Sequence, residues 1–267
     1  RTGLDRRRLE RGMCGIAGIV ARAPVAPDAL SAMIAPIEHR GPDGAGSWFN
    51  AGRTVAFGHR RLAVIDPTPA GAQPMSDVSG NSVVTFNGEI YNYLEIAERL
   101  KAEGVVFRTH CDTEVLLAAY LQWGEDCLAE FNGMFAFAIF DARKGHLFCA
   151  RDRFGEKPFL FAESLNILPL HRKKSLFALD GIGAGLDEPR LLRFLHAPRQ
   201  GLDDNRQTVF KEIEQLLPGE QAVLDIETLE LTVTRYWDVR PDSNVAGLSE
   251  EDAVARFRDL LTDSVRL

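Results

Sequence analysis

The apolar run Met134–Phe140 limits the fold of this chain more than any other stretch of its 267 residues. A short apolar run bounded by turn residues is typical of a buried strand. The turn-rich segment 141–145 and the strand-like segment 146–150 follow it, so the two strands are expected to form an antiparallel hairpin. We therefore assign this hairpin to the core of the domain and not to a cofactor-binding segment.

Other strand-like and helical patterns lie on both sides of this hairpin. The expected strands are 14–20, 55–57, 62–65, 82–86, 221–225 and 231–235. The expected helices are 28–37 with Asp28 as its N-cap, 93–103, 114–123, and a helix after its N-cap Ser249. Antiparallel strand pairs with helices grouped between them predict an α+β layered fold. A Rossmann domain is disfavoured, because strands and helices do not alternate strictly and no GxGxxG motif follows a strand.

The composition disfavours several classes of function. With a net charge of −7, the chain has no electrostatic support for nucleic-acid binding. No apolar run approaches the roughly 20 residues that cross a bilayer, so no membrane association is expected. The four cysteines show no CxxC pair and no metal-ligand spacing, which favours a reduced, cytoplasmic protein without a structural metal.

One cysteine stands at a position with special chemistry. Cys14 directly follows Met13, so a chain that began at Cys14 would carry a thiol and a free α-amine on one residue. An α-amine with a pKa of roughly 7.7–8.0 can take the thiol proton near neutral pH, and the thiolate is the reactive form. Because twelve residues precede Met13, this nitrogen lies in a peptide bond in the chain as written.

Five stretches are polar or glycine-rich where structure alone does not require it, namely 14–15, 39–43, 59–62, 87–92 and 111–114. Together they resemble the glutaminase domain of the class II (N-terminal nucleophile, Ntn) glutamine amidotransferases. Segments 70–74, 132–137 and 151–158 narrow the resemblance to the glutamine-hydrolysing asparagine synthetases. It covers about residues 13–160 and resumes from about Leu176. The resemblance implies an α+β, four-layer αββα sandwich, in which two antiparallel sheets lie between helices.

The resemblance also implies a role for each residue of a glutamine site. Cys14 would attack the side-chain amide of glutamine to form a thioester. The Asn87 side-chain amide and the Gly88 backbone N–H would bind the oxyanion. Arg61 would hold the carboxylate of glutamine, and Asp112 would hold its ammonium group. The remaining expected glutamine-binding residues are Leu62, Ala63, Val64, Ile65 and Glu89.

Each role has a structural alternative that the sequence alone leaves open. Cys14 could be a small buried apolar residue, and Asn87-Gly88 could be a plain hairpin turn. Arg61, next to Arg60, could be a solvated charge. Asp112 could simply cap the N-terminus of the helix that follows it.

The expected domain organisation has three parts. Residues 1–13 are an extension that is removed or not translated in the active form, and residues 14–225 are the glutaminase domain. Residues 245–267 are expected to be the first helix of a truncated ATP-dependent synthetase domain, because no Ser-Gly-Gly-x-Asp-Ser loop occurs in the chain. Segment 163–174 departs from the family, whose Ala-Ser-Glu triplet is missing there. No metal or cofactor is expected in this part, whereas the missing synthetase domain would use ATP and Mg²⁺.

The leading hypothesis is a glutaminase that supplies ammonia to a synthetase domain making asparagine from aspartate. One alternative is an amidotransferase with another acceptor, as in natural-product or polysaccharide clusters. A second alternative is a non-catalytic glutamine-binding fragment in which Cys14 stays blocked. The expected partners are glutamine and a C-terminal synthetase domain, and the sequence leaves open whether the protein forms a homodimer.

Overall fold

The computed structural model describes residues 14–162, 182–183, 185–197, 204–242, 244–245 and 247–266. The expectations for residues 1–13 and for segment 163–174 lie outside this part of the chain. Contacts divide the protein into two compact units, Arg1–Tyr236 and Trp237–Leu267. Both large sheets belong to the first unit, and each unit is described by itself.

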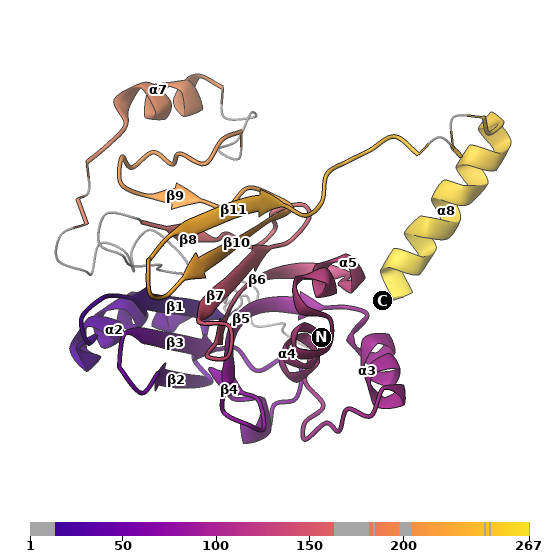
Figure 1. Cartoon of the computed structure of the whole chain (residues 1–267). Coiled ribbons are helices and arrows are strands. Elements are labelled where there is room, and N and C mark those ends of the chain that lie inside the picture. The colour runs from indigo at the N-terminus through magenta and orange to yellow at the C-terminus, as the bar shows by residue number, and fades with distance from the viewer. Residues whose placement is uncertain are drawn as a thin grey trace, which may run out of the picture. The chain divides into compact units, whose positions relative to one another are not determined.

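Two antiparallel sheets face each other in the first unit (Figure 1). The three-stranded sheet has the order β1 (Gly15–Val20), β3 (Val55–Arg61), β2 (Gly44–Phe49). The six-stranded sheet has the order β11 (Leu231–Arg235), β10 (Glu220–Asp225), β7 (His146–Arg151), β6 (Gly133–Asp141), β5 (Ser82–Ile90), β4 (Met75–Ser76). Strands β1 and β3 contact β5, which places the two sheets against one another there. A separate two-stranded sheet pairs β8 (Leu160–Phe161) with β9 (Glu214–Gln215).

The side chains of β6 alternate between two apolar cores, because successive residues of a strand point to opposite faces. The core between the sheets contains, among others, Ile16, Val20, Val55, Phe57, Val83, Ala136, Ala138 and Phe140. The core between the six-stranded sheet and its helices contains, among others, Phe86, Ile96, Leu100, Val115, Leu116, Phe135, Phe137 and Ile139. The hairpin expected from the apolar run is confirmed as β6 and β7, and β6 is buried on both faces.

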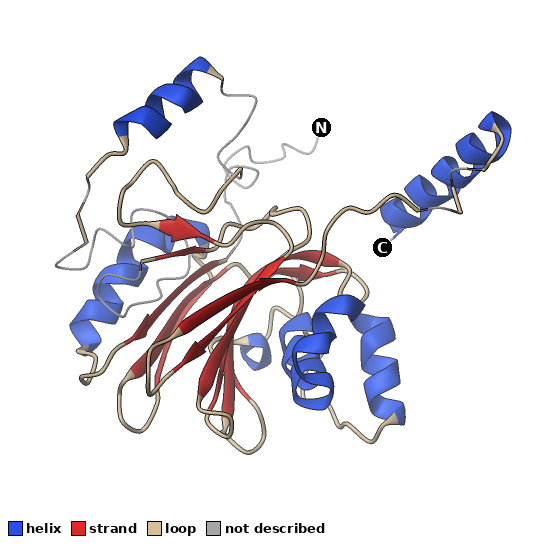
Figure 2. Ribbon diagram, turned by 45° about the horizontal axis from the view of Figure 1, so that its top comes forward, coloured by secondary structure: helices blue, strands red, loops and turns tan. Residues whose placement is uncertain are grey.

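Helices cover the outer face of each sheet, which gives four layers (Figure 2). Outside the six-stranded sheet lie α3 (Tyr93–Ala102), α4 (Asp112–Trp123) and the short α5 (Cys127–Glu130). Outside the three-stranded sheet lies α2 (Pro27–Ile34), whose Leu30 and Met33 pack in one cluster with Ala17 and Ile19 of β1. The expected α+β, four-layer αββα sandwich is confirmed. The described residues of this unit also contain three short 3-10 helices, η1 (Ala35–Arg40), η2 (Pro69–Gly71) and η3 (Gly124–Asp126).

Three local expectations for residues 26–65 are wrong. No strand covers 62–65, because the pairing of β3 with β2 ends at Arg61 and the chain continues as a loop. The N-cap of α2 is Ala26 and not Asp28, since Pro27 occupies the first turn, where its missing N–H costs nothing. The helix also ends at Ile34 and continues as η1.

The hairpin-turn alternative for Asn87-Gly88 is wrong as well. Strand β5 continues through both residues to Ile90, and they pair with Ala136 and Phe135 of β6. Pairing with the apolar central strand outweighs the local preference of Asn-Gly for a turn. Both residues therefore lie within the sheet, where pairing with β6 holds one side of their backbone.

The second unit contains α8 (Glu250–Arg266). Ser249 caps this helix as expected, because its Oγ accepts a hydrogen bond from the N–H of Asp252 at 3.2 Å. No residue of α8 is buried.

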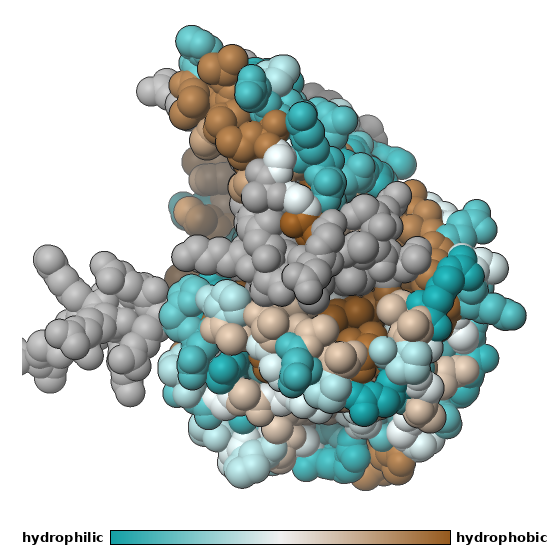
Figure 3. Space-filling view, turned by 90° about the vertical axis from the view of Figure 1, so that its left-hand side faces the viewer, coloured by the Kyte–Doolittle hydropathy of each residue, from teal (hydrophilic) through white to brown (hydrophobic). Residues whose placement is uncertain are grey.

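Helix α7 (Glu188–His196), which belongs to the first unit, carries exposed apolar side chains. Leu192 and Leu195 are 55% and 63% exposed, and apolar side chains gather over α7 at the top of Figure 3.

Of the helices that the structure describes, none has the length and apolarity that a membrane span requires.

Candidate active site

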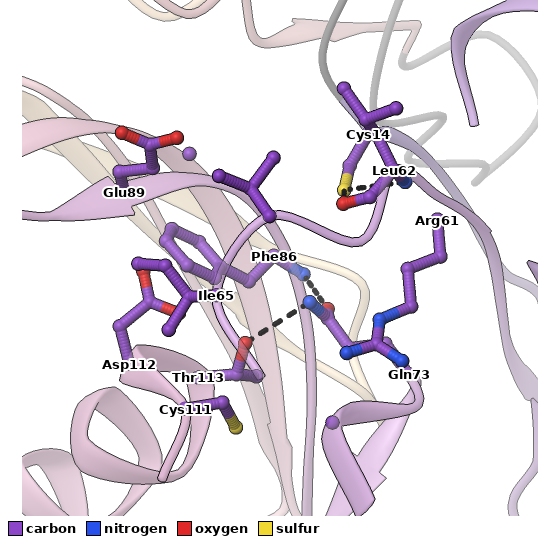
Figure 4. Close-up of a pocket in the computed structure, with 13 residues that line it drawn as sticks. Cys14, Arg61, Leu62, Ile65, Gln73, Phe86, Glu89, Cys111, Asp112 and Thr113 are labelled. Carbon is purple, nitrogen blue, oxygen red and sulfur yellow. Dashed lines mark hydrogen bonds between the residues drawn. The ribbon is translucent and has the colours of Figure 1, made fainter. Parts of the chain in front are cut away.

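A pocket lies beside the start of β1, where the two sheets meet the loop after β3 and the N-terminus of α4 (Figure 4). It brings together eight of the expected site residues, namely Cys14, Arg61, Leu62, Val64, Ile65, Gly88, Glu89 and Asp112. Two others, Ala63 and Asn87, do not line it. The lining is completed by Gly71, Gln73, Phe86, Cys111 and Thr113.

Cys14 contributes its thiol to this pocket. The backbone N–H of Leu62 donates a hydrogen bond to Sγ at 3.3 Å. Burial raises the pKa of the Cys14 thiol, while the Leu62 N–H and the positive charge of Arg61 act in the opposite direction. Because burial is the largest of these effects, the thiol needs a nearby proton acceptor before it can react near neutral pH.

Arg61 is held at the pocket by carbonyl groups of the loop that follows it. Its guanidinium donates to the carbonyl oxygen of Thr68 at 2.7 Å and to that of Asp66. Gly71 makes room for it, since a Cβ there would lie 2.3 Å from Nη2 of Arg61. A guanidinium has five N–H donors, so this arrangement orients Arg61 and leaves donors for a carboxylate.

The neighbouring Arg60 has a different environment. Its guanidinium lies 3.6 Å from the carboxylate of Glu38 and does not line the pocket. Side chains of successive strand residues point to opposite faces, which separates Arg60 from Arg61 at the end of β3. The geometry thus supports Arg61 as the residue of this pair that meets a ligand.

Asp112 provides a carboxylate on the opposite wall. Figure 4 shows Asp112 and Glu89 on one side of the pocket and Arg61 on the other. The carboxylate of Asp112 accepts from the N–H of Ile90 at 3.1 Å, and burial raises the pKa of Asp112 to about 6. Asp112 is not the N-cap of α4, because Cys111 holds that position. Its carboxylate is consequently available to the pocket.

One edge of β5 presents backbone N–H groups to this region. The N–H groups of Phe86, Gly88 and Ile90 all lie on the side of β5 opposite β6. Alternate residues of an antiparallel strand direct their N–H groups to the same side. The N–H of Phe86 is accepted by Oε1 of Gln73 at 2.7 Å, and that of Ile90 by Asp112. Within the described residues, no acceptor takes the N–H of Gly88 between them. A single free N–H therefore faces the pocket from this edge.

The side chain of Asn87 lies behind this edge and is 0% exposed. In the described structure, neither its Nδ2 nor its Oδ1 has a hydrogen-bond partner. By the alternation of β5, Asn87 points to the same face as Val83, which belongs to the core between the sheets. The same alternation directs Cys14 to that face, since Ile16 of β1 lies in this core. A buried amide without partners costs about 1–3 kcal/mol, and a catalytic role is one of the explanations for such a group in a native structure.

His59 of β3 joins the two sheets beside Asn87. Its Nε2 lies 3.2 Å from the carbonyl oxygen of Phe86, and because a carbonyl only accepts, Nε2 carries the proton. Burial lowers the pKa of His59 to about 3, so the imidazole is neutral near pH 7. This bond fixes the peptide group between Phe86 and Asn87.

Sequence reasoning missed the roles of Gln73, His59 and Thr113. Gln73 lies in segment 70–74 and His59 in segment 59–62, both of which contributed to the resemblance without a stated function. Only the folded chain shows that the Gln73 side chain reaches both β5 and α4. No group of His, Cys, Asp and Glu side chains in the described part of the chain is arranged to hold a metal ion.

Comparison with known proteins finds a matching domain family and longer relatives with glutamine-related names. A family model described as a glutamine amidotransferase domain matches residues 13–237. The chain is 35% identical over 262 residues to a Bacillus subtilis protein named glutamine-hydrolyzing asparagine synthetase 3, covering 95% of this chain and 41% of that protein. It is 32% identical over 283 residues to a putative glutamine-hydrolyzing asparagine synthetase 2 of Methanocaldococcus jannaschii, covering 96% of this chain and 52% of that protein.

Two further comparisons extend this picture. A Gibberella zeae protein named amidase chry2 is 30% identical over 272 residues, covering 96% of this chain and 39% of that protein. The chain thus spans about half or less of the length of these curated relatives. Among solved structures, the glutamine phosphoribosylpyrophosphate amidotransferase of Bacillus subtilis matches with a TM-score of 0.55 at 18% identity, covering 84% of this chain and 49% of that chain. This last likeness concerns the fold.

Proposed function

This chain belongs to the family of glutamine amidotransferase domains, and we propose that it hydrolyses the side-chain amide of glutamine with Cys14 as its N-terminal nucleophile. One observation carries the proposal: a single pocket joins the thiol of Cys14, the free N–H of Gly88, and partners for both charges of a free amino acid. Arg61 lies on one wall and Asp112 on the other (Figure 4). A free amino acid held between these walls would bind Arg61 through its carboxylate, and Asp112 and Glu89 through its ammonium group. The loop residues Leu62, Ala63, Val64 and Ile65 are proposed to enclose the substrate.

The proposed reaction begins with transfer of the thiol proton to the α-amine of Cys14. The thiolate then attacks the amide carbon of glutamine, and the oxyanion is bound by the Gly88 N–H and the Asn87 side-chain amide. The protonated α-amine returns a proton to the leaving nitrogen, so ammonia departs and a thioester to Cys14 remains. Water, deprotonated by the same amine, hydrolyses the thioester to glutamate and frees the thiol.

This mechanism requires that residues 1–13 be absent from the active protein. With Met13 attached, the nitrogen of Cys14 is an amide and cannot take a proton. Burial of the thiol makes the requirement stricter, because it raises the pKa of Cys14. We propose that the active form begins at Cys14, either because translation starts at Met13 or because a cleavage removes the extension.

Ammonia would pass to a synthetase domain that follows the glutaminase part. The proposal is supported by the names of two relatives and by their greater length. Such a domain would use ATP and Mg²⁺ to activate aspartate and form asparagine, and the protein would act in the cytoplasm. A different acceptor is the second candidate, favoured by the similar identity to the protein named amidase chry2. Assay of the full-length protein with aspartate, ATP and Mg²⁺ separates them, since only the first candidate yields asparagine.

Glutamine hydrolysis itself is tested on a chain that begins at Cys14. Equimolar release of ammonia and glutamate from glutamine supports the proposal. Binding of glutamine without any hydrolysis would favour the non-catalytic alternative instead.

Replacing Asp112 by Asn is expected to weaken glutamine binding more than it slows the reaction. The Asn oxygen can still accept the N–H of Ile90, so the variant removes the charge and keeps this bond. A hydrogen bond to a charged group contributes about 1.5–3 kcal/mol, which corresponds to a KM roughly 10- to 100-fold higher with little change in kcat. Ammonia release measured against glutamine concentration checks this prediction.

The advantage of the wild type over Asp112→Asn is also expected to depend on pH. The pKa of Asp112 is raised to about 6, so its carboxylate is ionised above that pH and neutral below it. The ratio of kcat/KM between wild type and variant should accordingly shrink as the pH falls through about 6. Titration of the α-amine affects both proteins and cancels in this ratio. A ratio that stays constant across this range would remove Asp112 from ammonium binding.

A further inference from the structure

We infer that Gln73 is a positioning residue of the proposed glutaminase, whose side chain holds the edge of β5 so that the Gly88 N–H points at the reacting amide. The inference rests on the proposed function. Gln73 is buried, with 9% of its surface exposed, and its side chain borders the pocket.

The edge of β5 needs such a support because its neighbouring strand is very short. β4 pairs only with Val83 and Val84, which leaves the edge beyond them without a strand partner. Oε1 of Gln73 accepts the N–H of Phe86 at 2.7 Å and so takes the place that a carbonyl of a longer β4 would fill. The peptide next in line along this edge is the one that carries the Gly88 N–H.

The other end of the same amide reaches the helix that carries the ammonium-binding carboxylate. Nε2 of Gln73 donates to Oγ1 of Thr113 at 3.1 Å, and Thr113 directly follows Asp112 at the start of α4 (Figure 4). One planar amide thus ties the edge of β5 to the N-terminus of α4. The Gln73 amide thereby constrains the distance between the Gly88 N–H and the Asp112 carboxylate.

The backbone of Gln73 packs closely against β2. A Cβ on Gly46 of β2 would lie 2.0 Å from the carbonyl oxygen of Gln73, so the two segments are in direct contact. His59 fixes the following peptide group of β5 through its bond to the Phe86 carbonyl. Gln73 and His59 consequently hold β5 by hydrogen bonds at Phe86, on the N-terminal side of Gly88, and Asp112 holds it by a hydrogen bond at Ile90.

The test compares Gln73→Met with wild type in a chain that begins at Cys14. Methionine has a similar length, but it cannot donate to Thr113 and offers Phe86 only a weak thioether acceptor. We expect kcat to fall about 10- to 100-fold, as for a displacement of roughly 1 Å at a catalytic group, with KM for glutamine changed less than threefold. Amide exchange measured by NMR should show faster exchange at Phe86 in the variant.

Two companion variants separate positioning from general stability. Thr113→Val removes only the acceptor for Nε2, and the double variant Gln73→Met/Thr113→Val is expected to be no slower than Gln73→Met alone, because the two residues act through one contact. Gln221→Met removes a glutamine that bonds Glu125 away from the pocket, and it should keep the wild-type kcat. Alkylation of Cys14 by iodoacetamide at wild-type rate would show that the nucleophile in Gln73→Met is intact.

The outcomes distinguish this inference from the proposed function. An active wild type with an unchanged kcat in Gln73→Met would overturn the role of Gln73 and leave the glutaminase proposal standing. A fall in kcat shared equally by Gln221→Met would mean that loss of stability and not positioning is responsible, which also overturns the inference. An inactive wild type that begins at Cys14 would instead contradict the proposed function.

Discussion

A chain that begins at Cys14 and carries Cys14→Ala is expected to release no ammonia from glutamine above the background of the assay. The substitution removes the only atom proposed to attack the amide, and loss of a hydrolase nucleophile costs about 10⁶-fold in kcat. Glutamine binding should persist, because Arg61 and Asp112, which both line the pocket, are proposed to supply the charged contacts. Calorimetric titration with glutamine and an ammonia assay measure the two effects separately.

The matched control for this experiment is Cys127→Ala. Cys127 is a buried residue of α5 in the core between the six-stranded sheet and its helices, and it does not line the pocket. The variant Cys127→Ala should keep the wild-type rate, which would show that loss of a buried thiol does not by itself inactivate the protein. Ammonia release by Cys14→Ala at even a few percent of the wild-type rate would exclude Cys14 as the nucleophile.

The variant Asn87→Ala is expected to lower kcat by about 10²–10³-fold, the usual effect of removing one oxyanion donor. In the resting protein the amide of Asn87 is buried without a partner, so its deletion breaks no hydrogen bond that the described structure contains. Relief of this unpaired amide offsets the packing lost on truncation, so folding stability should change little, whereas the transition state loses a donor. KM for glutamine should stay near the wild-type value, because the charged groups of the substrate are proposed to bind Arg61 and Asp112 instead.

Thr85→Val provides a control on the same strand. Thr85 shares the buried face of β5 with Asn87, and its hydroxyl also has no partner in the described part of the chain. Because no role in the reaction is assigned to it, Thr85→Val should keep kcat close to wild type. An Asn87→Ala variant as active as Thr85→Val would show that Asn87 does not bind the oxyanion.

Much of the fold could be predicted because it depends on local hydrophobic pattern. The apolar run 134–140 determines a strand that packs on both faces, and its alternation between two cores follows directly from the period of a strand. By contrast, residues 62–65 have a strand-like composition but leave the sheet, since β2 pairs with β3 only as far as Arg61. Composition cannot reveal where a neighbouring strand ends.

The candidate site shows the same division between local and long-range information. The family resemblance implied that Cys14, Arg61 and Asp112 belong to one site, and these residues line one pocket. The resemblance also implied the Gly88 N–H as an oxyanion donor, but that the protein leaves this N–H free could not be read from the sequence. It depends on Gln73 and Asp112 occupying the N–H groups on either side, and both contacts join segments far apart in the chain.

The N-terminus of the active protein is the central point of this account, because the proposed base is the α-amine of Cys14. The most direct test measures ammonia release from glutamine by a chain that begins at Cys14 and by the chain that keeps residues 1–13. The intact mass of each is recorded after the assay. We predict activity only where the mass corresponds to a chain beginning at Cys14. Equal activity in a protein whose mass still includes residues 1–13 would contradict the account.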